Sequence, residues 1–162
     1  MEAATKSFHR LGLAWLLLTV ALCLHVLDEA TTGFLAIYNP TVMIVQERWN
    51  WFPMPTFGFR EWLAGLIFSC TALFLIAPLF FRGGRLLRIP AAIFAGLMIL
   101  NGCGHIMVTI LGRTVANISV PRPAPGFWSS PLLIGASVWF LVELARSRRN
   151  VTSETTRHRR ME

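Results

Sequence analysis

Residues 11–29 read "LGLAWLLLTVALCLHVLDE", an apolar run that ends in one histidine and two carboxylates. At about 1.5 Å per residue, a helix of this length crosses most of the roughly 30 Å hydrocarbon core of a bilayer. His25, Asp28 and Glu29 would then lie near one edge of that core, where ionisable side chains are costly to bury. The stretch predicts a membrane-spanning helix that carries a polar site.

The composition of the whole chain points the same way. Of 162 residues, 54% are hydrophobic and 14% are charged, and the mean hydropathy of +0.56 excludes an ordinary water-soluble domain. Further apolar stretches cover residues 61–81, 89–112 and 127–145. The sequence therefore predicts an all-α, polytopic membrane four-helix bundle, with residues 1–146 as a single transmembrane domain.

The sequence also predicts the structure of the segments between these spans and of the C-terminal tail. Residues 34–45, "FLAIYNPTVMIV", are apolar but too short to cross a bilayer, and Pro40 lies among them, so they predict a re-entrant or interfacial segment. The short connection at residues 82–87, "RGGRLL", predicts that the second and third spans pack as an antiparallel pair. Residues 147–162 predict a disordered basic tail, and Glu143, among arginines just before it, is expected to be solvated.

The basic residues give an orientation. The net charge of +7 does not form a stripe interleaved with aromatics, so a nucleic-acid partner is not expected, and membrane lipids are. Eleven of the 15 Lys and Arg residues fall on the side of both termini. The other four are Arg48, Arg60, Arg113 and Arg122. By the positive-inside rule both termini are cytoplasmic. The number of subunits and any protein partner stay open.

This orientation brings several polar residues to one depth, near the outer face of the membrane. They are His25, Asp28, Glu29, Glu61, Asn101 and His105. The pairs His25–Glu29 and Asn101–His105 are each spaced i,i+4, so each pair occupies one face of its helix. Because an unpaired charge facing lipid is costly, both faces are expected to point inward.

Two imidazoles and several carboxylates favour two kinds of chemistry. As ligands for zinc, iron or manganese, the predicted set is His25, Asp28, Glu29, Glu61 and His105. As an acid–base site, the predicted catalytic groups are His25, Glu29 and His105, with Asn101 and Arg60 contacting substrate. The position of Asp28 on the helix also allows it to face Arg60 or the external loop.

Three short motifs resemble the bacterial membrane proteins known for an HXXEE motif. They are "HVLDE" at residues 25–29, "NGCGH" at residues 101–105 and "PAPGFWSSPLLI" at residues 123–134. Asp28 stands where the first glutamate of that motif would be. The resemblance implies a protein of the bacterial inner membrane with a shared polar site, and it supplies no reaction.

Three classes of function remain open from the sequence. The first is a metal-dependent or acid–base enzyme that acts on a lipid or other amphiphile. The second is a binder or carrier, either of a b-type haem held by His25 and His105 or of an ion. The third is a structural subunit whose polar cluster only locks helices together.

Overall fold

The computed structural model describes the backbone of residues 2–159 and the side chains of residues 5–84 and 86–147. Its elements are α1 (Glu2–Thr32), α2 (Leu35–Arg48), α3 (Phe59–Phe81), the short 3-10 helix η1 (Arg85–Leu87), α4 (Arg88–Leu111) and α5 (Ser130–Arg159). Over these residues the only β-type pairing is an isolated bridge between Arg113 and Ser119. The all-α prediction is confirmed for the described chain.

Within the described part of the chain, three helices are long and apolar enough to cross a membrane: α1 over Thr5–Thr32, α3 and α4. They coincide with the first three predicted spans. The fourth predicted span, 127–145, falls mostly in α5, which begins at Ser130 and continues beyond its apolar part into the charged C-terminal segment. The assignment of α5 as a fourth span stays a prediction.

The long helices are joined by an aromatic cluster around Trp15 of α1. Its ring stacks on Phe80 of α3, with 4.2 Å between ring centroids, and meets Phe140 of α5 edge-on at 5.3 Å. Phe94 of α4 lies 5.8 Å away. The indole N–H donates to the carbonyl of Leu73 at 2.9 Å, so the polar atom of this buried ring is satisfied.

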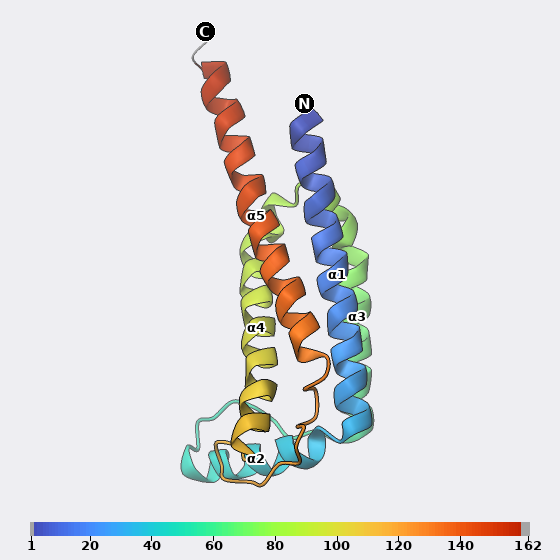
Figure 1. Ribbon diagram of the computed structural model, residues 1–162, viewed down its shortest axis with the longest axis vertical. Coiled ribbons are helices and arrows are strands. Elements are labelled where there is room, and N and C mark those ends of the chain that lie inside the picture. Colours follow the sequence, from blue (N-terminus) through green and yellow to red (C-terminus); the bar gives the residue numbers. More distant parts are fainter. Residues whose placement is uncertain (1, 160–162) are drawn as a thin grey trace.

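The order of the helices differs from the expectation for α3 and α4. Among the described residues α3 packs on α1, α1 on α5, and α5 on α4, whereas α3 and α4 make little direct contact (Figure 1). α1 buries Leu11 and Leu18 against its neighbours, whereas Leu13, Val20 and Leu27 on another part of its circumference are exposed. Phe8 of α1 also packs against Gly83 in the short connection, which has a positive φ of 89°. A short connection makes two consecutive helices antiparallel, but it does not require them to pack against each other.

α2 lies across the ends of the long helices, at the end opposite the two termini (Figure 1). The segment that follows it is tied back by Asn39, whose amide donates to the carbonyl of Phe57 at 2.9 Å and accepts from its N–H at 3.1 Å. Tyr38 donates its hydroxyl to the carbonyl of Pro55 at 3.0 Å. α2 is thus held in place by hydrogen bonds to the chain that leads into α3.

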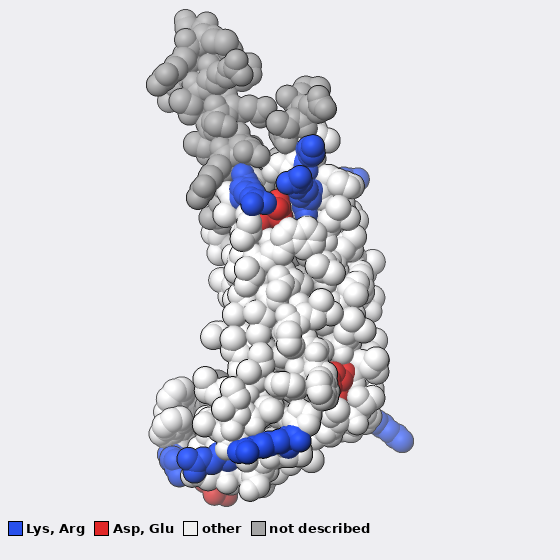
Figure 2. Space-filling view, in the orientation of Figure 1, with Lys and Arg blue, Asp and Glu red and all other residues white. Residues whose placement is uncertain are grey.

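The charged side chains gather at the two ends of the molecule, with an almost uncharged belt between them on the face shown in Figure 2. Large apolar side chains are also exposed along α3 and α4, among them Phe68 (77%), Leu75 (75%) and Ile93 (60%). A soluble protein rarely exposes so many apolar side chains together. The belt is the surface expected of a protein that lies in lipid.

In the C-terminal part, Glu143 is buried and the backbone of α5 continues far into the basic tail. Glu143 is 3% exposed and its carboxylate lies 2.7 Å from the Arg146 guanidinium, so the expectation of a solvated group was wrong. Its neighbour Leu144 is buried too, because α5 packs against both α1 and α4. The helical backbone continues to Arg159 through most of the tail expected to be disordered, where neither Gly nor Pro interrupts it. Residues 160–162 lie outside the described part.

Candidate metal site

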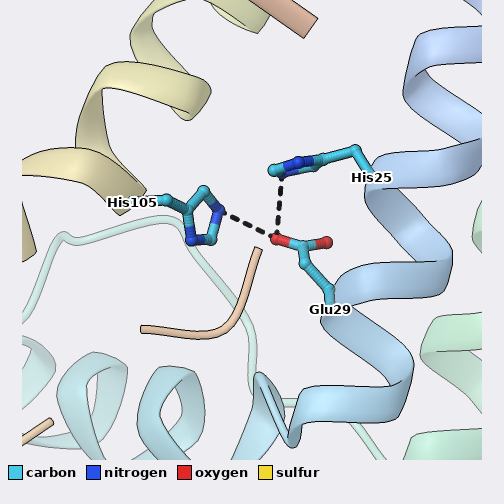
Figure 3. A group of neighbouring side chains, drawn as sticks. All are labelled: His25, Glu29 and His105. Carbon is cyan, nitrogen blue, oxygen red and sulfur yellow. Dashed lines mark ion pairs between the residues drawn. The ribbon is translucent and has the colours of Figure 1, made fainter. Parts of the chain in front are cut away.

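His25 and Glu29 lie one turn apart near the end of α1, and His105 reaches them from α4 (Figure 3). His25 is fully buried, Glu29 is 6% exposed, and the side chain of His105 is 10% exposed. One ligand atom from each of the three lies within 4.8 Å of the others. The prediction that the helix faces carrying these three groups point inward, toward each other, is confirmed.

Both imidazoles approach the same carboxylate oxygen. Glu29 Oε1 lies 3.0 Å from His105 Nε2 and 3.5 Å from His25 Nε2 (Figure 3). The two rings are nearly perpendicular, at 71°, with 4.9 Å between their centroids. The two nitrogens and the oxygen therefore converge on one small region, as the ligands of a single ion would.

The other nitrogen of His25 contacts a residue that the sequence did not single out. Ser129 Oγ lies 2.8 Å from His25 Nδ1, across 104 positions of the chain. Ser129 immediately precedes α5 and is 8% exposed. It belongs to the "PAPGFWSSPLLI" motif, from which no site residue was predicted. A serine directly after such a turn was the signal available, and it is a weak one.

Asp28 lies beside this group and not in it. Its Oδ2 accepts hydrogen bonds from Ser129 N at 2.9 Å and from Ser129 Oγ at 2.8 Å. The predicted role of Asp28 as a ligand is therefore not supported, because both contacts tie its carboxylate to Ser129, at the end of the loop between α4 and α5. The alternative expectation, that Asp28 faces that loop, agrees with its position.

These contacts determine where His25 carries its proton. Ser129 has one hydroxyl hydrogen, and Asp28 Oδ2 and the Gly126 carbonyl, 3.2 Å away, can only accept it. Ser129 Oγ must then accept a hydrogen bond from His25 Nδ1–H. In the neutral imidazole this leaves a lone pair on Nε2, the atom that faces Glu29. Metal-binding histidines are commonly fixed this way by a partner on their other nitrogen.

Asn101 and Gly126 complete the surroundings. Asn101 Nδ2 lies 2.9 Å from His25 Nε2, so it occupies that lone pair in the absence of an ion. Gly126 has a positive φ of 79°, and a Cβ built there would lie 2.9 Å from two atoms of the His105 ring. The turn into α5 thus contacts both imidazoles: Gly126 lies against the His105 ring, and Ser129 contacts His25.

Two predicted site residues lie elsewhere. Glu61 is exposed, and its carboxylate accepts a hydrogen bond from Gly58 N at 3.1 Å, in the capping arrangement at the start of α3. That contact satisfies a free N–H of the helix terminus. Arg60 is exposed in the same first turn. Among the described residues, the ligand group consists of His25, Glu29 and His105. It contains neither Glu61 nor Asp28, because two side chains at the same depth in the membrane can still lie on different faces of their helices.

An apolar groove of about 280 Å³ adjoins the site. Its walls come from α2, from α4 and from the loop between α4 and α5. Its lining comprises Phe34, Ile37, Tyr38, Thr41, Leu100, Asn101, Gly104, His105, Val108, Thr114, Val115, Val120, Ala124 and Pro125. Leu100 and Val115 are 69% and 83% exposed, so the groove is open to the surroundings. His105 and Asn101 are the points at which it meets the ligand group.

No protein-family model, curated protein or solved structure matches this chain. The likeness to the HXXEE proteins therefore stays a prediction that rests on short motifs.

Proposed function

We propose that this chain is a small membrane enzyme in which His25, Glu29 and His105 bind one divalent transition-metal ion and act on a lipid or other amphiphile. The observation that carries this proposal is the convergence of three buried donor atoms within 4.8 Å. A buried carboxylate between two imidazoles is costly without a charge to neutralise it, and a cation supplies that charge. The open groove beside His105 offers a route for a substrate.

The donor set favours particular ions. Two histidines and one carboxylate are the protein ligands of many catalytic zinc sites and of non-haem iron(II) sites, which keep positions open for water or substrate. Because two of the three donors are imidazoles, zinc or iron suits the site better than manganese. Such an ion would supply Lewis-acid chemistry or an activated water. Glu29 would also be available for proton transfer, and Asn101 would orient the substrate.

The other two classes of function explain less of this geometry. A haem would need its flat ring between the imidazoles, where the Glu29 carboxylate lies in contact with both. A purely structural cluster needs hydrogen bonds between helices, but it does not need three metal-ligand atoms that point to one place. Neither alternative accounts for the groove that ends at His105.

The membrane arrangement is part of the proposal. α1, α3, α4 and the apolar part of α5 form a four-helix bundle across the bacterial inner membrane, with both termini in the cytoplasm. α2 is then an interfacial helix on the outer side, which its position across the helix ends supports better than a re-entrant path (Figure 1). The HXXEE-like motif of α1 would place the metal site toward the outer leaflet.

The proposed orientation predicts the outcome of reporter fusions. A fluorescent protein fused after Glu162 should fluoresce, because it stays in the cytoplasm, and alkaline phosphatase inserted near Gly58 should be active, because it lies outside. A fusion after Glu162 that does not fluoresce, with no phosphatase activity from the insertion near Gly58, would place the site at the inner leaflet.

Metal analysis tests the site directly. Protein purified in detergent, stripped with a chelator and dialysed against zinc or anaerobic iron(II) should retain about one equivalent of ion, in keeping with one three-donor site. Bound metal should also raise the thermal midpoint, since a ligand at 100 times its Kd stabilises the folded state by about 2.7 kcal/mol. Retention of neither ion, with no change in midpoint, would contradict the proposal.

A further inference from the structure

The groove beside the site has a lining that restricts what it can bind. Most of its wall is aliphatic or aromatic, so it fits an apolar chain. Gly104 lies on this wall, and a Cβ built there would have no neighbour within 4 Å. The missing side chain therefore leaves open width along α4, where a larger residue would fill the groove.

None of the described residues that line the groove carries a permanent charge. Each of its hydroxyl oxygens already has a hydrogen-bond partner within the protein. Tyr38 donates to the carbonyl of Pro55, Thr41 donates to the carbonyl of Ile37 at 2.7 Å, and Thr114 accepts from Ala116 N at 3.2 Å. Burial raises the pKa of Tyr38, so this phenol stays protonated at neutral pH. A charged group placed in this groove would find no compensating partner there.

Asn101 and His105 provide the remaining polar groups, and they lie where the groove meets the ligand group. The Asn101 amide has a second hydrogen and an oxygen besides its contact with His25. His105 directs Nε2 toward Glu29, and its Nδ1 lies against Gly126, so Asn101 offers the free donor and acceptor at this end of the groove. An amide suits a hydroxyl, which donates and accepts hydrogen bonds, or a carbonyl, which only accepts them. The buried Glu29 carboxylate nearby disfavours an anion.

We infer that the groove holds the chain of an uncharged single-chain amphiphile, with its hydroxyl or carbonyl end at Asn101 and His105. The chemical consequence rests on the proposed function, because only a bound metal would act on that end. The binding itself requires only the groove. A long-chain alcohol or aldehyde is the class that fits, whereas a fatty phosphate or a long-chain ammonium ion would bring a charge without a partner.

Photo-cross-linking tests this inference. Metal-free protein in phosphatidylcholine vesicles is irradiated with a diazirine derivative of dodecanol, and the labelled peptides are mapped by mass spectrometry. Label should concentrate in α2 and in residues 100–108 of α4. Excess dodecanol should compete at least about ten times better than dodecyl phosphate or dodecyltrimethylammonium, because burying an unpaired charge is costly.

Two glycine variants of α4 supply the matched comparison. Gly104→Leu should remove most of the groove label. Gly96→Leu should leave it unchanged, because Gly96 also has no neighbour within 4 Å of a built Cβ but does not line the groove. Both variants should bind metal as the wild type does. Label spread evenly over lipid-facing helices, label unaffected by Gly104→Leu, or better competition by a charged chain would overturn the inference. Loss of metal binding with intact groove labelling would instead overturn the proposed function.

Discussion

Replacing Glu29 with Gln should weaken zinc or iron binding by more than about 100-fold, beyond the 10–100-fold loss typical of residues that only support a ligand. The amide keeps the shape of the side chain but loses the negative charge that faces both imidazoles. His25→Gln and His105→Gln should have effects of similar size, because each removes one of the three converging donors. The measurement is a competition titration with a chelator of known affinity on detergent-purified protein.

A matched control comes from the same helix. His9 of α1 packs against Phe81 of α3, with 5.5 Å between ring centroids, at the opposite end of the molecule from the site. His9→Gln should bind metal as the wild type does. Unchanged affinity in all three ligand variants would mean that the ion binds elsewhere. A variant that loses metal while its elution volume and metal-free thermal midpoint match the wild type has lost the site and not the fold.

Replacing Ser129 with Ala should weaken metal binding by about 10–100-fold. The hydroxyl does not belong to the ligand group, and its expected effect comes from holding His25 in the tautomer that directs the Nε2 lone pair at Glu29. Without it, His25 Nδ1–H and one acceptor site of Asp28 lose a buried partner. Ser129→Thr keeps the hydroxyl and should recover most of the affinity in the same chelator titration.

Ser130→Ala is the control for this substitution. Ser130 is fully buried, and its hydroxyl donates to the Gly126 carbonyl at 2.6 Å, without a contact to His25. If loss of any buried hydroxyl in this turn loosens the site, Ser130→Ala should weaken metal binding as much as Ser129→Ala. If Ser129 acts through His25, only Ser129→Ala should do so. Equal losses would refute the positioning role.

The sequence by itself determined the parts of this protein that depend on local pattern. Runs of apolar residues identified α1, α3 and α4, because span length and helical rise are properties of a single segment. The i,i+4 spacing of His25 and Glu29 put both on one face for the same reason. The cost of burying such groups in lipid then predicted that His105, at the same depth, would join them.

The tertiary structure alone decided which neighbours each helix has and how it is rotated about its axis. From their predicted depth in the membrane, Glu61 and His105 were equally good candidates for the site. In the structure the Glu61 carboxylate caps α3, whereas His105 lies with His25 and Glu29. The short connection between α3 and α4 predicted that these two helices pack as a pair. In the structure, packing around Trp15 instead places α3 mainly against α1, and α4 packs mainly against α5. The contact between His25 and Ser129 spans 104 positions. Such choices depend on the packing of several helices at once, which no periodicity within one segment encodes.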